Sequence, residues 1–114
     1  LYWKIKRWWE RLKEIENFPP KIKNYLKIKK PLSIFTNAGC QKCGKTGFSG
    51  RIGVFEILTM TKSLSDIILK EPSEAMIKKE AEDQGMITMK QDGILKVLNG
   101  ITTIEEVLRA AEEK

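Results

Sequence analysis

Apolar residues recur three or four positions apart over the first eighteen residues of the chain. This spacing predicts an amphipathic helix over residues 1–18, because positions three and four apart share one helix face. Pro19-Pro20 is expected to end that helix, since proline has no N–H to donate. Residues 21–30 are basic with scattered apolar positions and predict either a short helix or a solvated connector. The apolar stripe consists of Leu1, Ile5, Trp8, Leu12 and Ile15.

Two short runs of β-branched and aromatic residues predict strands at residues 32–36 and 52–58. Between them, residues 38–53 contain five glycines and both cysteines. Such a density of glycine predicts turns and close backbone approaches, because glycine is costly inside a helix. The middle of the chain is therefore expected to be a glycine-rich, cysteine-containing turn that leads into a strand.

Helix-capping residues are frequent from residue 61 to the end of the chain. Ser, Thr and Asp before an apolar periodic run favour a helix start, and glycine after such a run favours its end. The second half is therefore predicted to be a small helical bundle. Starts are expected at Ser63 with Asp66, at Pro72-Ser73, at Thr88 with Gln91 and at Thr102 with Glu105, and ends at Gly85 and Gly100.

The charge is concentrated in one region of the chain. Of the 114 residues, the first 35 carry ten Lys or Arg and three Glu, whereas the remainder carries eleven Lys or Arg and twelve Asp or Glu. The net charge of +6 thus belongs to a basic arm, residues 1–30 and their connector. Such an arm suits a membrane surface, a nucleic acid, or packing of its Trp face on the rest of the protein.

Composition excludes several other classes of protein. No apolar run approaches the roughly 18–20 residues of a membrane span. The chain is also too short for a complete doubly wound domain, which typically needs roughly 150 residues. Histidine is absent, so the commonest general base and the commonest metal ligand are both missing.

Residues 39–46 match the pattern G-x-x-x-x-G-K-[ST] of a phosphate-binding loop. That loop also needs a helix that begins at Lys45-Thr46, because the helix N-terminus forms part of the anion site. Three glycines follow within the next seven residues, and each costs a helix about 1 kcal/mol relative to alanine. We therefore expect the match to be accidental.

Cys40 and Cys43 form a C-x-x-C pair within the same turn. A redox dithiol of the thioredoxin kind would sit at a helix N-terminus, which the glycines disfavour. A structural zinc ion prefers four ligands, and the chain has no other cysteine and no histidine. Either two further ligands lie outside this chain, or the cysteines are ordinary small residues of a turn.

The residues around this pair resemble the signature of the type II secretion and type IV pilus assembly ATPases. The resemblance covers roughly residues 38–110 and depends on the order and spacing of two groups of motifs. The first is Gly39-Cys40-x-x-Cys43-x-x-Thr46-Gly47-Phe48-x-Gly50-Arg51-x-Gly53-x-Phe55-Glu56-x-Leu58. The second comprises Gly85-Met86, Asp92-Gly93, Lys96 and Gly100-Ile101-Thr102-Thr103-x-Glu105-Glu106-Val107-x-Arg109.

The resemblance implies that the chain is the C-terminal part of a hexameric α/β P-loop ATPase. Such enzymes drive pilin or pseudopilin assembly, with a platform of membrane proteins, from the cytoplasmic face of the inner membrane. Their ATP- and Mg²⁺-binding motifs lie upstream of the cysteines, so this chain is expected not to hydrolyse ATP by itself. Family members carry two C-x-x-C pairs that share one zinc. Cys40 and Cys43 match the second pair, which implies a zinc half-site.

Two charged residues stand in the motif that follows the turn. Arg51 and Glu56 are five positions apart, so on a strand they would face opposite sides and need separate partners. They are expected to serve either a structural role or a contact between subunits. The Asp92-Gly93 and Thr102-Thr103 pairs are expected to serve helix capping and packing only.

Together these observations predict an α+β, mainly α chain in three parts: an arm and connector at 1–37, the turn and strand at 38–58, and a helical bundle at 59–114. Its expected role is subunit packing and coupling within the ATPase, peripheral to the inner membrane and without nucleic acid, with membrane-surface contact by residues 1–30. The alternatives are a small zinc or redox adaptor, and a basic membrane- or nucleic-acid-binding module.

Overall fold

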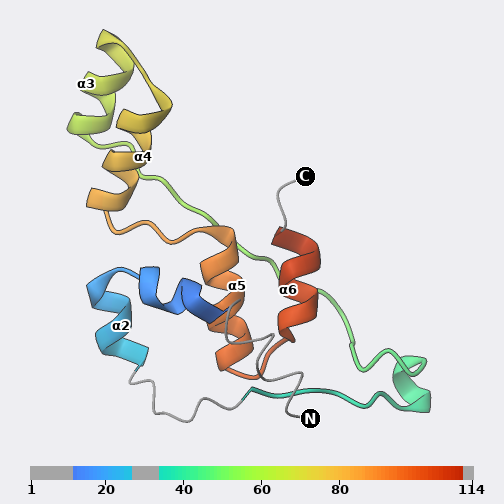
Figure 1. Cartoon of the computed structure of the whole chain (residues 1–114). Coiled ribbons are helices and arrows are strands. Elements are labelled where there is room, and N and C mark those ends of the chain that lie inside the picture. Colours follow the sequence, from blue (N-terminus) through green and yellow to red (C-terminus); the bar gives the residue numbers. More distant parts are fainter. Residues whose placement is uncertain (1–11, 27–33, 112–114) are drawn as a thin grey trace.

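The computed structural model describes residues 12–26 and 34–111 of the chain (Figure 1). Within these residues all regular structure is helical, so the predicted mainly α character is confirmed. The elements are the 3₁₀ helices η1 (Leu12–Asn17) and η2 (Gln41–Cys43) and the α-helices α2 (Pro20–Leu26), α3 (Lys62–Lys70), α4 (Glu74–Asp83), α5 (Met89–Leu98) and α6 (Ile104–Ala111).

The main core lies where α5 packs against α6 and η1. Ile94 and Val97 of α5 are both 0 % exposed, and Ile104 of α6 is 1 % exposed. The helices come close because α5 carries Gly93 at their contact, where an added Cβ would lie 2.4 Å from Val107 Cγ1. Phe18, which follows η1, is 2 % exposed and closes the same core.

Helices α3 and α4 pack on each other as a hairpin set apart from α5 and α6 (Figure 1). Leu64 and Ala81 are buried in this hairpin. The predicted start of α3 at Ser63 is wrong, because the hydroxyl of Thr61 accepts the bond from the Leu64 N–H and caps the helix two residues earlier. Ser73 caps α4 as predicted and accepts a bond from the Met76 N–H.

The ends of α5 follow the sequence prediction. The Thr88 hydroxyl accepts from the Gln91 N–H, and the Gln91 side chain accepts from the Thr88 N–H, so both partners of the capping box are present. Gly100, just past the helix, has a φ of 72°, a value that glycine adopts at little cost. Helix α6 begins at Ile104, one residue later than a cap at Thr102 requires, and the Thr103 carbonyl accepts from the Val107 N–H.

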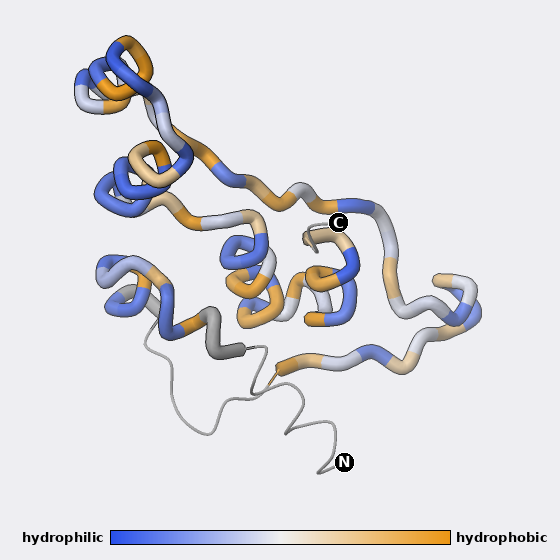
Figure 2. The backbone as a smooth tube through the Cα atoms, turned by 45° about the horizontal axis from the view of Figure 1, so that its top comes forward, coloured by the Kyte–Doolittle hydropathy of each residue, from blue (hydrophilic) through white to orange (hydrophobic). Residues whose placement is uncertain are grey.

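Both predicted strands are wrong within the residues that the structure describes. Residues 34–36, and residues 48–60 including the expected strand 52–58, are irregular, and no strand forms among the described residues. Figure 2 shows apolar positions along this segment as well as in α5 and α6. Their side chains are exposed, as in Phe55 at 61 % and Ile57 at 72 %. A strand forms only against a neighbour that accepts its backbone hydrogen bonds, and none of the described segments provides one.

The N-terminal prediction is tested only in part. Residues 1–11, most of the expected amphipathic helix, lie outside the described residues, as do residues 27–33. The end of that expected helix is the 3₁₀ helix η1, which stops at Asn17, before the two prolines. Pro20 then opens α2, which confirms a short helix in the basic region; proline suits the first helical position because the N–H it lacks would have no partner there.

Candidate functional site

The cysteine turn, residues 39–47, is held by its own backbone. The Lys45 N–H donates to the Cys40 carbonyl at 2.7 Å, and the Gly44 N–H donates to the Gln41 carbonyl at 3.1 Å. Gly44 and Lys45 both have positive φ, 64° and 61°. Gly39 is required for a different reason, because an added Cβ there would lie 2.4 Å from the Lys45 carbonyl oxygen.

This turn brings the two sulfurs together, with Cys40 Sγ 3.6 Å from Cys43 Sγ. Cys43 Sγ also accepts the backbone N–H groups of Cys40 and Gly47, each at 3.1 Å. These two bonds lower the pKa of the Cys43 thiol to about 7, because they stabilise the thiolate. Cys40 is exposed and Cys43 is half-buried, so both sulfurs lie at the surface of the turn.

The spacing of the sulfurs fits two ligands of one tetrahedral metal ion. Zn–S bonds of about 2.3 Å in tetrahedral geometry place two sulfurs about 3.8 Å apart. N–H groups that donate to a metal-binding sulfur are also the usual support around such a ligand. Among the described residues no group of three or more cysteine or acidic side chains gathers in one place. The described part of the chain therefore brings together two thiols that could share a metal ion, with no third potential ligand beside them.

The turn lacks the geometry of a phosphate-binding loop, as its glycines predict. No helix begins at Lys45-Thr46, since the described residues that follow are irregular until α3 starts at Lys62. Lys45 adopts a left-handed backbone conformation. The Thr46 hydroxyl donates to the Cys43 carbonyl at 2.8 Å. Without a helix N-terminus, these residues lack the dipole and the free N–H groups that hold phosphate.

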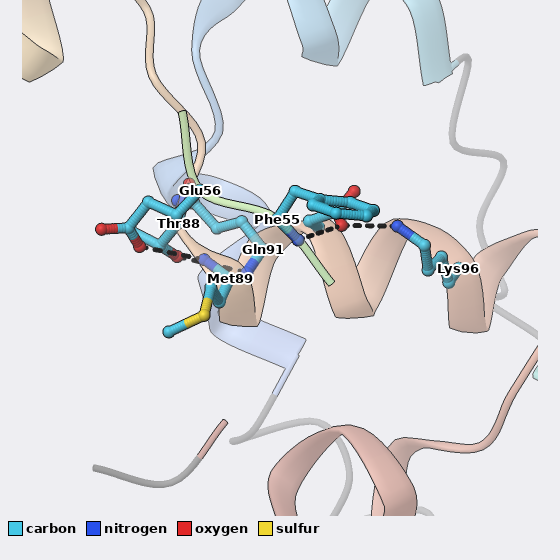
Figure 3. Close-up of polar contacts among 7 residues, drawn as sticks. Phe55, Glu56, Thr88, Met89, Gln91 and Lys96 are labelled. Atoms are coloured by element: carbon cyan, nitrogen blue, oxygen red, sulfur yellow. Dashed lines mark hydrogen bonds and ion pairs between the residues drawn. The ribbon is translucent and has the colours of Figure 1, made fainter. Parts of the chain in front are cut away.

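A second cluster, which we call the α5 clamp, joins the irregular segment to the start of α5 (Figure 3). The Phe55 N–H donates to Asp92 Oδ2 at 2.9 Å, and the Met89 N–H donates to Glu56 Oε2 at 3.0 Å. Asp92 also pairs with Lys96, whose Nζ lies 5.8 Å from the centre of the Phe55 ring. The clamp consists of Phe55, Glu56, Met89, Asp92 and Lys96.

A third cluster joins the same segment to the α3–α4 hairpin. The Gln84 amide pairs with the backbone of Thr59, accepting from its N–H at 3.1 Å and donating to its carbonyl at 2.9 Å. Gln84 also donates to Glu80. Glu80 accepts the hydroxyl groups of Thr61 and Ser63, each at 2.8 Å. Hydrogen bonds from Gln84, Ser63 and Thr61 lower the pKa of Glu80, because they favour the carboxylate.

An open hollow of about 400 Å³ lies between these two clusters. Its walls are the side of the segment at residues 55–59 and the connection between α4 and α5 at residues 84–87. The clusters therefore border a shallow surface depression, and the depression is more apolar than polar.

The family model for the type II/IV secretion system protein matches residues 12–109, which is most of the chain. The chain belongs to the type II/IV secretion system protein family. It is 37% identical over 82 residues to the type IV pilus assembly ATPase TfpB of Acinetobacter baylyi, covering 72% of this chain and 14% of that protein. It is 40% identical over 75 residues to the type IV pilus assembly ATPase PilB of Thermus thermophilus, covering 66% and 8%.

A type II secretion protein is similar to the chain as well. The type II secretion system ATPase E of Vibrio cholerae is 36% identical over 87 residues, which cover 76% of this chain and 17% of that protein. The chain thus spans less than a fifth of the length of these curated relatives. These matches confirm the resemblance found in the motifs.

In this member of the secretion family, Glu56 and Arg51 do not meet. Glu56 binds the N-terminus of α5, whereas Arg51 is exposed and has no hydrogen bond or ion pair with the described residues. Asp92 holds the Phe55 backbone, a contact that the sequence analysis missed. An acidic residue in the first turn of a helix can be recognised from the sequence, and the helix dipole stabilises its negative charge. The sequence does not show which distant N–H group its side chain binds.

No described helix of this family member is both long enough and apolar enough to cross a bilayer.

Proposed function

We propose that the chain is the C-terminal part of a hexameric ATPase that powers type II secretion or type IV pilus assembly. Its role there is to pack subunits and to couple hydrolysis to movement, while upstream motifs bind ATP and Mg²⁺. The complete enzyme would act in the cytoplasm, at platform proteins of the inner membrane. The observation that supports this role is that residues of the family motifs join separate parts of the chain. Glu56 and Asp92 bond the irregular segment to the start of α5, and Lys96 pairs with Asp92.

The exposed segment at residues 52–60 supports the same role. It carries large apolar side chains in the open, and the α5 clamp still holds its backbone in one place. An apolar stretch held in position but left uncovered suits a surface that the rest of a longer protein covers. Because the curated relatives are several times longer than this chain, the covering part would come from the remainder of such a protein.

We also propose that Cys40 and Cys43 are half of a structural zinc site. Their sulfur spacing fits tetrahedral coordination, and the N–H groups of Cys40 and Gly47 support the Cys43 sulfur. Zinc, when bound, would cross-link this turn to the segment that supplies the other two ligands. Two ligands from outside the described residues are needed to complete the site.

The proposed role is tested by exchange with a relative. In the Vibrio cholerae secretion ATPase, the stretch that aligns with this chain is replaced by residues of this chain, and a second protein lacks the stretch. We expect the exchanged protein to form hexamers and to hydrolyse ATP, and the shortened protein to bind nucleotide without assembling. Size-exclusion chromatography with light scattering and a phosphate-release assay measure both properties.

A matched pair of variants of the exchanged protein tests the α5 clamp. Glu56→Gln together with Asp92→Asn should weaken assembly and hydrolysis, whereas Glu82→Gln with Asp66→Asn, two exposed acids away from the clamp, should not.

The exchange experiment also has an outcome that contradicts the proposal. If the shortened protein assembles and hydrolyses ATP as well as the exchanged one, the proposed role is wrong.

A further inference from the structure

We propose that Cys40 and Cys43 form a reversible disulfide by exchange with a small-molecule disulfide such as glutathione disulfide, and that this oxidation switches off metal binding at the turn. The second half of this proposal rests on the zinc half-site proposed above. The first half depends only on the described geometry of the two thiols.

The two sulfurs are in direct contact. They lie 3.6 Å apart, and a disulfide brings two sulfurs to about 2.05 Å. Closing the remaining distance of about 1.5 Å requires rotation of the cysteine side chains. The turn lies at the end of an irregular segment, away from the α5–α6 core (Figure 1), so closing the bond disturbs no buried packing.

The turn holds the thiols in place before any oxidation. The Lys45–Cys40 and Gly44–Gln41 backbone bonds close the loop on both sides of Cys43. Close approach of Gly39 to the Lys45 carbonyl leaves no room for a side chain at residue 39. A thiol held next to its partner reacts at a high effective concentration, because the entropy of bringing the sulfurs together is already lost.

The exchange takes place in two steps, and both cysteines are accessible at the surface of the turn. The thiolate of one cysteine attacks one sulfur of glutathione disulfide, which forms a mixed disulfide and releases one glutathione thiolate. The thiolate of the other cysteine then attacks the protein sulfur of this mixed disulfide and releases the second glutathione thiolate. Two protein thiols are oxidised to one disulfide, glutathione disulfide is reduced to two glutathiones, and the two protons leave with them.

Oxidation and metal binding exclude each other. Zinc binds cysteine as the thiolate. The two sulfurs that would bind zinc are the same two that form the disulfide. Once these sulfurs share a bond, the turn has no thiolate left to donate. The turn can therefore bind metal only when it is reduced, and the disulfide forms only when no metal holds the two sulfurs.

The disulfide is tested on the metal-free 114-residue chain in buffers of defined ratio of glutathione to glutathione disulfide. Samples are acid-quenched, and the oxidised fraction is measured by the loss of two hydrogens in intact mass. We expect the native chain to be half-oxidised at a glutathione disulfide level at least tenfold lower than the same chain in urea. An equal midpoint in both, or oxidation only between chains, overturns the proposal.

Two glycine variants show whether the turn geometry is responsible, since neither changes a thiol. Gly39→Ala forces a Cβ to 2.4 Å from the Lys45 carbonyl oxygen, whereas a Cβ at Gly44 meets nothing within 4 Å. Asparagine tolerates the left-handed backbone that Gly44 adopts. We expect Gly39→Ala to shift the midpoint toward that of the urea sample and Gly44→Asn to leave it nearly unchanged. A midpoint that does not move in Gly39→Ala contradicts the role of the turn.

The metal half of the proposal is tested separately. The reduced exchanged protein described above, in which the remainder of the relative can supply the two missing ligands, is titrated with Co²⁺, whose thiolate absorption reports binding, and is then oxidised with glutathione disulfide. We expect the absorption to appear in the reduced protein and to be lost on oxidation, and to be weakened in Cys40→Ser or Cys43→Ser. If the reduced exchanged protein and its Cys40→Ser variant give the same absorption, the zinc half-site is wrong, while the mass measurement still decides the disulfide.

Discussion

At the residue scale, Gly93 shows how one small side chain determines the approach of two helices. An isolated helix gains about 1 kcal/mol when glycine is replaced by alanine. In α5 the opposite sign is expected, because a Cβ at residue 93 would lie 2.4 Å from Val107 Cγ1 and 3.0 Å from Val107 Cγ2. Val107 is buried in α6 and cannot move aside without disturbing the core.

We therefore predict that Gly93→Ala destabilises the chain by about 1–3 kcal/mol, the usual cost of overpacking a core. Urea unfolding followed by far-ultraviolet circular dichroism measures this change. Gly53→Ala is the matched control, since a Cβ there meets only the ring of the exposed Phe55, which can rotate away. A Gly93→Ala chain as stable as the unaltered one would show that α5 and α6 are not this close.

Glu80 is a second residue whose contacts affect the stability of the folded chain. Its carboxylate accepts bonds from Thr61, Ser63 and Gln84, which lower its pKa. A carboxylate with a lowered pKa stabilises the folded state above the unfolded pKa of about 4.3. That stabilisation is lost as the pH falls through the lower folded pKa, because the unfolded chain then takes up protons first.

The unaltered chain is thus predicted to be more stable than Glu80→Gln at pH 7, with a difference that shrinks below about pH 4.3. Free energies of unfolding measured from pH 7 downward test this. Glu106, whose pKa is lowered by Arg109, is common to both chains and cancels. Glu82→Gln, which removes an exposed carboxylate on the same helix but outside this network, is the matched control. A Glu80→Gln difference independent of pH contradicts the network.

At the element scale, the irregular segment at residues 48–60 has a defined position although it is neither helix nor strand. The α5 clamp holds one part of it and Gln84 holds the other, at Phe55–Glu56 and at Thr59 respectively. In a sheet, a neighbouring strand would accept the backbone N–H groups of such a segment. Here side-chain oxygens of Asp92 and Gln84 accept the N–H groups of Phe55 and Thr59.

Asp92→Ala should therefore release the Phe55 backbone. We predict a rise of about tenfold in hydrogen exchange at the Phe55 amide, since a hydrogen bond to a charged group contributes roughly 1.5 kcal/mol or more. Exchange within α6 should not change. Asp66→Ala, an exposed acid on α3, is the control. Unchanged exchange at Phe55 in the Asp92 variant would show that the clamp does not hold the segment.

At the scale of the whole molecule, five of the described helices form two packed groups, the α3–α4 hairpin and the core of α5, α6 and η1. The match to a phosphate-binding motif lies outside both groups, in the cysteine turn, where the needed helix is missing from the described residues.

We accordingly predict that the 114-residue chain neither binds nor hydrolyses ATP. Isothermal titration calorimetry and phosphate release should give no signal above that of heat-denatured chain, and Lys45→Ala should change nothing. Specific nucleotide binding that Lys45→Ala removes would restore the phosphate-loop interpretation of residues 39–46.

The sequence by itself determined the features that depend on neighbours in the chain. Ser73 and Thr88 cap their helices within three residues, and Gly85 and Gly100 follow helix ends with a backbone that glycine adopts readily. The family signature could be recognised for a similar reason, because order and spacing along the chain carry it. The accidental nature of the phosphate-loop match could likewise be predicted from the glycines after Thr46.

Only the tertiary structure decided what depends on partners distant in the chain. The expected strand at 52–58 is irregular because a strand needs a neighbour, and the described residues supply side chains in its place. The links from Glu56 to Met89 and from Phe55 to Asp92 join residues more than thirty positions apart. Hydropathy and capping patterns report on local backbone and burial, so they do not specify such pairings.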